Sequence, residues 1–351
     1  MNYFLPLLTA AFFSFIFTYP TIILAKKFKI VTDKNKRKHP AHTHIGVIPR
    51  GGGLPIFLSF LISSLFFLTI NKIILGIIIA SFLLLVVGLL DDYFDLSPYL
   101  RFIANLLIAA LVVGFGLGIP YISNPLGGVI GLDQWKIDFD FFGHRQILIL
   151  ADILSIIWLT WLTNMVNWSK GVDGQLPGFV AVAAFFLGLL SQRFTVHDIS
   201  IQSVTILSFI IGGAYLGFLP WNFYPQKIMP GYGGGALAGF WLGILSSLSF
   251  GKGGTAILIL SMPMIDAIYT IIRRIYQKKS PFKADWGHFH HRLLEIGWGK
   301  RRIAIFYWLV SFILGTASLF LKGFDKLLAF LSFFVILIVF ILIIEKVKKI
   351  K

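Results

Sequence analysis

Residues 73–95 read IILGIIIASFLLLVVGLLDDYFD, an uninterrupted apolar run that ends in three carboxylates. A helix needs about 20 largely apolar residues to cross the hydrocarbon core of a bilayer. The run is therefore predicted to form a membrane-spanning helix with its carboxylates at one membrane face. Similar runs recur along the chain, near residues 3–25, 52–70, 73–90, 103–121, 147–166, 175–190, 200–220, 235–250, 254–272, 303–321 and 327–344.

The composition of the whole chain is that of a membrane protein. Its 351 residues are 57% hydrophobic and 13% charged, whereas soluble domains are about 45–50% apolar and about 25% charged. The absence of cysteine excludes disulfides, thiol nucleophiles and cysteine metal sites. The apolar runs are continuous rather than alternating, which favours helices over a β-barrel. The sequence predicts one all-α polytopic domain, residues 1–351, with about 11 transmembrane helices.

Lysine and arginine gather on one side of the predicted helices. If the N-terminus is outside, most of the 31 basic residues fall in segments that face the cytoplasm. This asymmetry predicts a multi-pass protein of the plasma membrane with its N-terminus out and its C-terminus in. It also accounts for the net charge of +16 without nucleic acid as a partner. In the longest outer segment, near 122–146, the alternation in Lys136–Asp140 predicts a short strand or hairpin.

Most polar clusters fall at predicted cytoplasmic helix ends, and polar groups at membrane depth are functional candidates because they are costly there. Asp91 and Asp92 form the first cluster. Two adjacent carboxylates repel each other unless a cation lies between them. Magnesium suits this place, with manganese as an alternative, because it accepts one or two carboxylates together with substrate phosphates. The alternative interpretation is a solvated helix terminus.

The second cluster lies in the stretch NMVNWSKGVDG, residues 164–174. Asn164 and Asn167 share a helix face because they are three residues apart, and the glycines that follow let the backbone approach a ligand closely. These amides and the Asp173 carboxylate are candidates to bind a sugar, a phosphate or a water. The alternative is a helix end followed by a glycine-rich turn.

The third cluster contains His288, His290, His291 and Arg292 in a basic loop. Imidazoles beside an arginine suit a phosphate anion. A transition metal is disfavoured because the neighbouring cations oppose it. The alternative is a basic loop that rests on anionic lipid headgroups.

Weaker signals complete the set. Lys38 and Arg50 offer cations for an anion in the first cytoplasmic loop, although the positive-inside rule also places such residues there. Asp266 is a lone acid near the end of an apolar run and is expected to pair with Arg273 or another base.

Together the clusters predict one basin at the cytoplasmic face. Its carboxylates, cations and apolar walls fit a transfer between a soluble nucleotide sugar and a membrane lipid phosphate.

Over nearly the whole chain, these motifs resemble the polyprenyl-phosphate N-acetylhexosamine-1-phosphate transferases, the superfamily of the MraY and WecA enzymes. Asp95-Leu96-Ser97-Pro98 is more similar to the WecA-like branch than to MraY. The residues that carry the resemblance are Arg37-Lys38-His39, Pro49-Arg50-Gly51-Gly52, Asp91, Asp92, Asp95, Asn164, Asn167, Gly171, Asp173-Gly174, Asp266 and His288 to Leu293.

The resemblance implies a reaction in which polyprenyl phosphate attacks the β-phosphate of a UDP-N-acetylhexosamine. The products are polyprenyl-diphospho-sugar and UMP, and the implied cofactor is Mg²⁺ or Mn²⁺. By this resemblance Asp91 and Asp92 lie near the metal and the lipid phosphate, and Asp173 joins the catalytic set. The residues expected to bind substrate are Lys38, Arg50, Asn164, Asn167, Lys170, His288, His290, His291 and Arg292.

Two positions depart from the family pattern. Lys170 stands where the family usually has an aspartate, and Tyr232 is the best match for a second aspartate in a glycine-rich loop. A protonated lysine cannot ligate Mg²⁺, and a neutral phenol is a poor ligand for it. Three accounts follow. The first is an active transferase in which Lys170 neutralises phosphate charge directly while Asp91, Asp92 and Asp173 hold one metal ion. The others are a catalytically silent paralogue that binds lipid phosphate or nucleotide sugar, and a transporter. The sugar, the polyprenol length, the downstream pathway and the choice between monomer and homodimer stay open.

Overall fold

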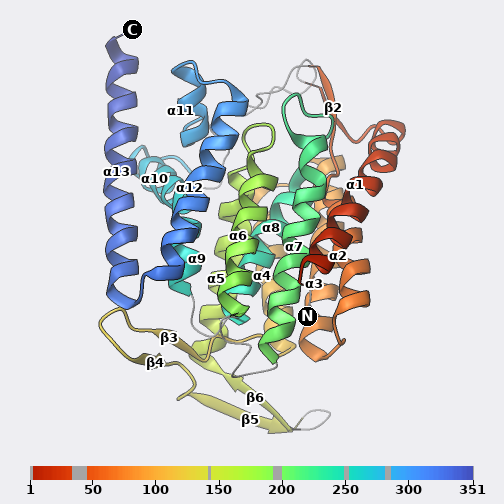
Figure 1. Ribbon diagram of the computed structural model, residues 1–351, viewed down its shortest axis with the longest axis vertical. Helices are drawn as coiled ribbons and strands as arrows, with labels where there is room; N and C mark the ends of the chain where they lie inside the picture. Colours follow the sequence, from red (N-terminus) through yellow and green to blue (C-terminus); the bar gives the residue numbers. More distant parts are fainter. Residues whose placement is uncertain are drawn as a thin grey trace.

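The computed structural model describes residues 3–33, 46–140, 144–192, 200–248, 253–280 and 286–350, and most of them are helical (Figure 1). The helices are α1 (Phe4–Lys27), α2 (Gly53–Phe67), α3 (Lys72–Phe94), α4 (Pro98–Gly114), α5 (Ile149–Trp168), α6 (Gln175–Gln192), α7 (Ser200–Asn222), α8 (Gly231–Leu248), α9 (Gly253–Ile259), α10 (Ser261–Tyr276), α11 (Phe289–Glu295), α12 (Lys300–Phe320) and α13 (Gly323–Ile350). The strands are β1 (Val31–Asp33), β2 (Val47–Pro49), β3 (Tyr121–Ser123), β4 (Val129–Gly131), β5 (Lys136–Asp140) and β6 (His144–Leu148).

Every predicted apolar run coincides with a helix, or with the bent pair α9–α10 for the run near 254–272. Among the described residues, seven helices are long and apolar enough to cross a membrane. The number is eight if α9 and α10, which meet at 79°, count as one span. Helices α2 and α4 are apolar but shorter. A polytopic membrane protein is thus confirmed, whereas the number of 11 spans and the orientation stay predictions.

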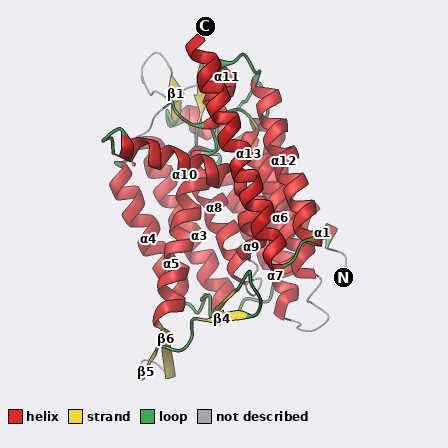
Figure 2. Cartoon of the chain, turned by 90° about the vertical axis from the view of Figure 1, so that its left-hand side faces the viewer, coloured by secondary structure: helices red, strands yellow, loops and turns green. Residues whose placement is uncertain are grey.

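The strands form three antiparallel pairs: β1 with β2, β3 with β4, and β5 with β6. The hairpin predicted from the alternation in Lys136–Asp140 is therefore confirmed as β5–β6. Figure 1 shows this hairpin at the opposite end of the bundle from β2, α11 and the C-terminus. Figure 2 shows α10 running across the direction of the other helices, where it contacts α5 and α13.

Local sequence signals explain how α3 and α4 present the carboxylates. The Asn71 side chain caps the start of α3 by accepting a hydrogen bond from the Ile74 N–H at 2.9 Å. Asp95 ends α3 in the left-handed conformation, with a φ of 52°. Ser97 then caps α4 by accepting from the Leu100 N–H at 3.2 Å, and Pro98 occupies the first turn, where its fixed φ favours a helix start. This tight turn places the last turn of α3 beside the first turns of α4.

Helix α8 lies at the centre of the bundle. Its residues from Gly231 to Ser247 are all buried, and it packs against α2, α3 and α5. Glycines permit the close approach: a Cβ on Gly88 would lie 2.3 Å from the Gly233 Cα, and one on Gly239 would lie 2.1 Å from the Leu162 carbonyl oxygen. Small residues let helix backbones approach in this way in membrane proteins. The start of α8 is thereby pressed against the carboxylate end of α3.

A stability prediction follows from the packing of α1 on α7. A Cβ on Gly217 would lie 2.0 Å from the Ala11 carbonyl oxygen, whereas Gly114 has no heavy atom within 4 Å of the same position. We expect Gly217→Ala to destabilise the protein by about 1–3 kcal/mol, the usual cost of overpacking, because a backbone atom must move. Gly114→Ala is the matched control and should be neutral. Thermal unfolding monitored by tryptophan fluorescence measures both, and equal melting temperatures would contradict the packing.

Candidate active site

The carboxylate of Asp92 joins three segments at one end of the bundle. It is buried, with 1% of the residue exposed. Its Oδ2 accepts a hydrogen bond from the Gly51 N–H at 3.0 Å, and its Oδ1 accepts one from the Tyr232 N–H at 3.1 Å. The Arg50 Nε lies 3.0 Å from Oδ1. Asp92 therefore ties the end of α3 to the loop before α2 and to the start of α8.

Asp91 has a different environment. Its Oδ1 lies 3.3 Å from the Arg101 Nη1, and its Oδ2 lies 3.8 Å from the Arg50 Nη2. Arg50 also reaches the Oδ1 of Asp95 at 3.0 Å. Unlike Asp92, Asp91 shows no hydrogen bond to a backbone N–H among the described residues. Asp91 is thus held by arginines, whose guanidinium groups also bind phosphates well.

Lys170, in the loop between α5 and α6, points into the same cluster. Its Nζ donates to the Asn167 Oδ1 at 2.7 Å and to the Gly231 carbonyl oxygen at 2.8 Å. Burial lowers the pKa of Lys170 to about 7, and the nearby carboxylate of Asp92 opposes this shift without cancelling it. The ammonium is thus stabilised by the neighbouring carboxylates but titrates close to neutral pH.

Tyr232 and the amides complete the cluster. The Asn105 Nδ2 donates to the Tyr232 hydroxyl at 2.8 Å and to the Asn164 Oδ1 at 3.2 Å. Two cations lie near the Tyr232 ring, the Arg101 guanidinium 5.1 Å and the Lys170 ammonium 5.6 Å from its centre. This is cation–π geometry. The phenol stands here as a neutral group held in place by a hydrogen bond.

Asp173 lies beyond this cluster and connects other segments. Its Oδ1 accepts from the Lys300 Nζ at 3.0 Å and from the Gln226 Nε2 at 3.1 Å, and its Oδ2 accepts from the Gln226 N–H at 3.3 Å. The carboxylate therefore joins the α5–α6 loop to the α7–α8 loop and to the start of α12. The catalytic role predicted for Asp173 stays a prediction, and in this geometry its contacts are positional.

The histidine segment forms a second, adjacent cluster. The Asp266 Oδ1 accepts from the Phe289 N–H at 2.7 Å, and its Oδ2 lies 2.9 Å from the His288 Nδ1. The prediction that Asp266 pairs with a base is confirmed, and His288 is that base. A Cβ on Gly171, the residue after Lys170, would lie 1.8 Å from the His290 Nε2. The two clusters therefore meet along the loop after α5.

Other members of the histidine segment are engaged within the protein. Arg292 pairs with Glu345 and donates from its Nε to the Gly287 carbonyl oxygen at 3.0 Å. Burial, with smaller contributions from His291 and His288, holds the pKa of His290 well below its usual value. His290 is therefore neutral, and it and Arg292 are 1% and 6% exposed. Their predicted role in binding a diphosphate stays a prediction and requires these contacts to rearrange. Lys38 lies outside the described residues.

Comparison with known proteins decides the family. The family model described as glycosyl transferase family 4 matches residues 74–250. The chain belongs to glycosyl transferase family 4. Among its relatives, a probable undecaprenyl-phosphate N-acetylglucosaminyl 1-phosphate transferase of Bacillus subtilis is 30% identical over 92% of this chain and 86% of its own length.

Other family 4 relatives carry similar names. A decaprenyl-phosphate N-acetylglucosaminephosphotransferase of Mycobacterium tuberculosis is 30% identical over 89% of this chain and 81% of its own length. An undecaprenyl-phosphate α-N-acetylglucosaminyl 1-phosphate transferase of Thermotoga maritima is 28% identical over 88% of this chain and 89% of its own length. The resemblance to the polyprenyl-phosphate N-acetylhexosamine-1-phosphate transferases is therefore confirmed, and with it membership of a transferase family of the membrane.

Two residues at the site of this family 4 chain were not predicted from the sequence. Arg101 and Asn105 contact the cluster from α4, one turn apart on the same helix face. The signal available for Arg101 was a basic residue one turn after the helix start at Ser97-Pro98. The tight turn before that helix places it near Asp91. For Asn105 the signal was its spacing of four residues from Arg101.

The residues at the site do not fit a divalent metal ion in this arrangement. No group of three or more His, Asp or Glu side chains that could hold a metal occurs in the described part of the chain. Both Asp92 oxygens accept backbone N–H groups, and the cations of Arg50, Arg101 and Lys170 already surround the two carboxylates. Another cation would be repelled by these three. The Mg²⁺ or Mn²⁺ expected from the sequence stays a prediction that this donor set does not favour.

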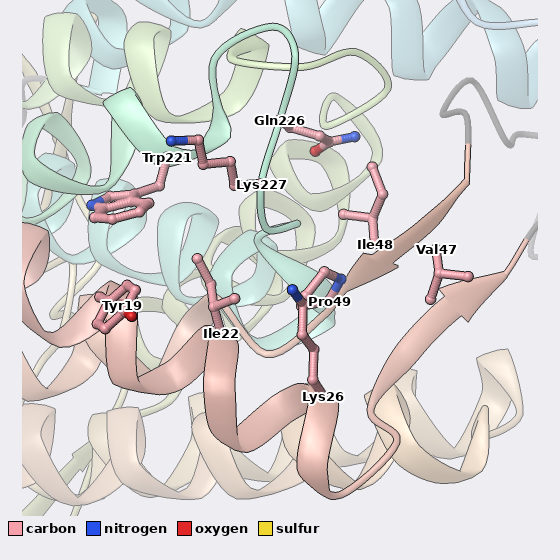
Figure 3. Close-up of a pocket in the computed structure, with 9 residues that line it drawn as sticks. All are labelled: Tyr19, Ile22, Lys26, Val47, Ile48, Pro49, Trp221, Gln226 and Lys227. Atoms are coloured by element: carbon pink, nitrogen blue, oxygen red, sulfur yellow. The ribbon is translucent and has the colours of Figure 1, made fainter.

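A separate pocket of about 380 Å³ opens at the same end of the bundle. Figure 3 shows it between the last turns of α1, strand β2 and the loop after α7. Its lining residues are Tyr19, Ile22, Lys26, Val47, Ile48, Pro49, Trp221, Gln226 and Lys227. Gln226 is shared with the Asp173 contacts. The pocket thus adjoins the contacts of Asp173 and is not lined by the carboxylates of α3.

Proposed function

We propose that this chain transfers an N-acetylhexosamine 1-phosphate group from a UDP-sugar to polyprenyl phosphate at the cytoplasmic face of the plasma membrane. The observation that carries the proposal is the cluster of Asp91, Asp92, Arg50, Arg101 and Lys170 at the end of a membrane-spanning helix. The names of the relatives support the lipid acceptor and the N-acetylglucosamine 1-phosphate group.

The surface beside the cluster supports a lipid acceptor. Phe94 at the end of α3 is 64% exposed, and Tyr99 at the start of α4 is 56% exposed. Leu100 and Ile103 on the same helix are also exposed. These apolar side chains flank Asp91 and Arg101 and would lie against lipid in a bilayer. A polyprenyl chain can therefore approach from the bilayer while its phosphate reaches the arginines.

The proposed reaction needs charge neutralisation more than proton transfer. An oxygen of the lipid phosphate attacks the β-phosphorus of the UDP-sugar and forms a new P–O bond. The bond from that phosphorus to the oxygen that bridges to the α-phosphorus breaks, and UMP leaves with that oxygen and its electron pair. Such displacements depend on positioning and on cations around the phosphoryl oxygens. Arg50, Arg101 and Lys170 would supply these cations, and Asp91 would accept the proton of a lipid phosphate that arrives protonated.

The proposal is tested by a transfer assay on the purified full-length protein, with UDP-N-acetylglucosamine and undecaprenyl phosphate. We expect release of UMP together with formation of the lipid diphospho-sugar. Asp91→Asn should lower the rate at least about a hundredfold, the lower range for loss of a general base, while leaving the protein folded. The Bacillus subtilis relative serves as the positive control. Absence of UMP release with several UDP-sugars, while that control is active, would reject the transferase and leave binding without turnover.

A further inference from the structure

The Lys170 ammonium occupies a place where oxygen atoms converge. Its Nζ lies 2.7 Å from the Asn167 Oδ1 and 2.8 Å from the Gly231 carbonyl oxygen. The N–H of the same peptide group, at the start of α8, points the other way and donates from Tyr232 to the Asp92 Oδ1 at 3.1 Å. One peptide group thus presents its carbonyl oxygen to the ammonium and its N–H to the carboxylate.

This set of oxygens is of the kind that hard cations bind. Amide and backbone carbonyl oxygens beside a carboxylate are typical ligands of Mg²⁺ and Ca²⁺. Here a side chain of the protein itself fills the position. A lysine ammonium has three N–H donors, and within the described residues two of them are used by Asn167 and Gly231. The third is available to a phosphate oxygen.

The neighbouring groups also favour a resident ammonium over a metal ion. Tyr232 contributes a neutral phenol, whose hydroxyl accepts a hydrogen bond from Asn105. A Cβ on Gly231 would lie 2.0 Å from the Asp92 Oδ2, so the backbone is packed directly against this carboxylate. The Asp92 oxygens are already engaged by N–H groups and by Arg50. The positive charge beside the carboxylates of Asp91 and Asp92 is therefore supplied by side chains of the protein.

We propose that the Lys170 ammonium takes the place of a divalent cation in this site, so that the chain binds the phosphates of its substrate without Mg²⁺. The proposal rests on the proposed function for the identity of those phosphates. Arg50 and Arg101 supply the remaining positive charge around Asp91 and Asp92. Lys170 would then be a substrate-binding residue that neutralises phosphoryl oxygens directly.

The first test measures the binding of Mn²⁺ to the full-length protein by electron paramagnetic resonance, after treatment with EDTA and its removal. We expect the wild type to bind no stoichiometric Mn²⁺. The double variant Lys170→Asp, Tyr232→Asp should gain one Mn²⁺ site per chain, because it removes the ammonium and adds two carboxylates to the oxygens of Asn167 and Gly231. Lys227→Asp is the control for an added carboxylate elsewhere at this end of the bundle, and it should gain none.

Stoichiometric binding of Mn²⁺ by the wild type that Asp91→Asn removes would overturn the proposal. So would a folded double variant that binds no Mn²⁺, because the oxygens around Lys170 would then not form a cation site. This readout does not require turnover. If the wild type releases no UMP under any condition, the proposed function fails, and the Mn²⁺ result still decides whether the ammonium replaces a metal.

A second measurement does not depend on the folding of the double variant. In the presence of EDTA, binding of uridine diphosphate to the wild type should equal binding in the presence of Mg²⁺ after correction for the magnesium complex of the free nucleotide. Lys170→Met should weaken binding in EDTA about tenfold or more, as expected for loss of a charge-assisted hydrogen bond. Lys227→Met should bind as the wild type does. Unchanged binding by Lys170→Met would overturn the proposal.

Discussion

The Asp92→Asn variant is expected to unfold well below the melting temperature of the wild type and to lose its transfer activity. In the wild type both carboxylate oxygens accept backbone N–H groups, from Gly51 and from Tyr232. An asparagine keeps one acceptor and turns an N–H donor toward the other N–H group. It also removes the charge that faces the Arg50 Nε at 3.0 Å. Leaving a buried donor and a cation without their partner costs about 3 kcal/mol.

The neighbouring carboxylate provides the matched control for this prediction. Asp91 is as buried as Asp92, each with 1% of the residue exposed, but its partners are Arg101 and Arg50 rather than backbone groups. Asp91→Asn should therefore melt closer to the wild type while losing activity. Melting temperatures from tryptophan fluorescence and UMP release, measured on the same samples, separate the two roles. Equal loss of stability in both variants would show that Asp92 does not join the three segments as described.

Binding of uridine diphosphate in EDTA is expected to weaken as the pH rises above 7. Burial lowers the pKa of Lys170 to about 7, so the free protein loses its ammonium above that pH, whereas a bound phosphate favours the protonated form. Affinity should therefore fall about tenfold for each pH unit until the pKa of the complex is reached. The charged groups that face Lys170 are Asp91, Asp92, Arg50 and Arg101, and none of these ordinarily titrates between pH 7 and 9.

The control for the pH dependence is Lys170→Arg, because a guanidinium stays protonated throughout this range. The terminal phosphate of the nucleotide loses its second proton near a pKa of about 6, so its own charge is constant above pH 7. Isothermal titration calorimetry from pH 7 to pH 9 would measure both proteins. A pH-independent affinity of the wild type, or the same slope in Lys170→Arg, would mean that the Lys170 ammonium does not hold the phosphate.

Much of the fold could be predicted because each helix is marked by a signal in its own contiguous residues. Apolar side chains over a spanning length require a backbone that satisfies its own hydrogen bonds, and the helix does this without help from distant residues. The turn between α3 and α4 is equally local, since Ser97 and Pro98 mark the start of a helix. The hairpin β5–β6 follows from the alternation in Lys136–Asp140.

The partners of the polar residues could not be predicted in the same way. Arg101 contacts Asp91, Lys300 contacts Asp173, and Glu345 pairs with Arg292. The partners in the last two pairs are 127 and 53 residues apart. Such contacts depend on which helices pack together, and a single sequence carries little trace of membrane helix interfaces. For this reason the sequence, which predicted a phosphate-binding loop, could not show that His288 and Arg292 contact Asp266 and Glu345 within the protein.

The amino-acid sequence by itself determined that this protein is a polytopic bundle, where its helices lie, and that acidic and amide motifs stand at their ends. Hydrophobic length and local capping are properties of contiguous residues, so they can be read along the chain. Only the tertiary structure decided that Asp92 is a structural junction, that Asp91 faces arginines, and that the Lys170 ammonium lies among the oxygens of Asn167 and Gly231. Those roles arise from the packing of α8 against α3 and α5, which brings together groups far apart in the sequence.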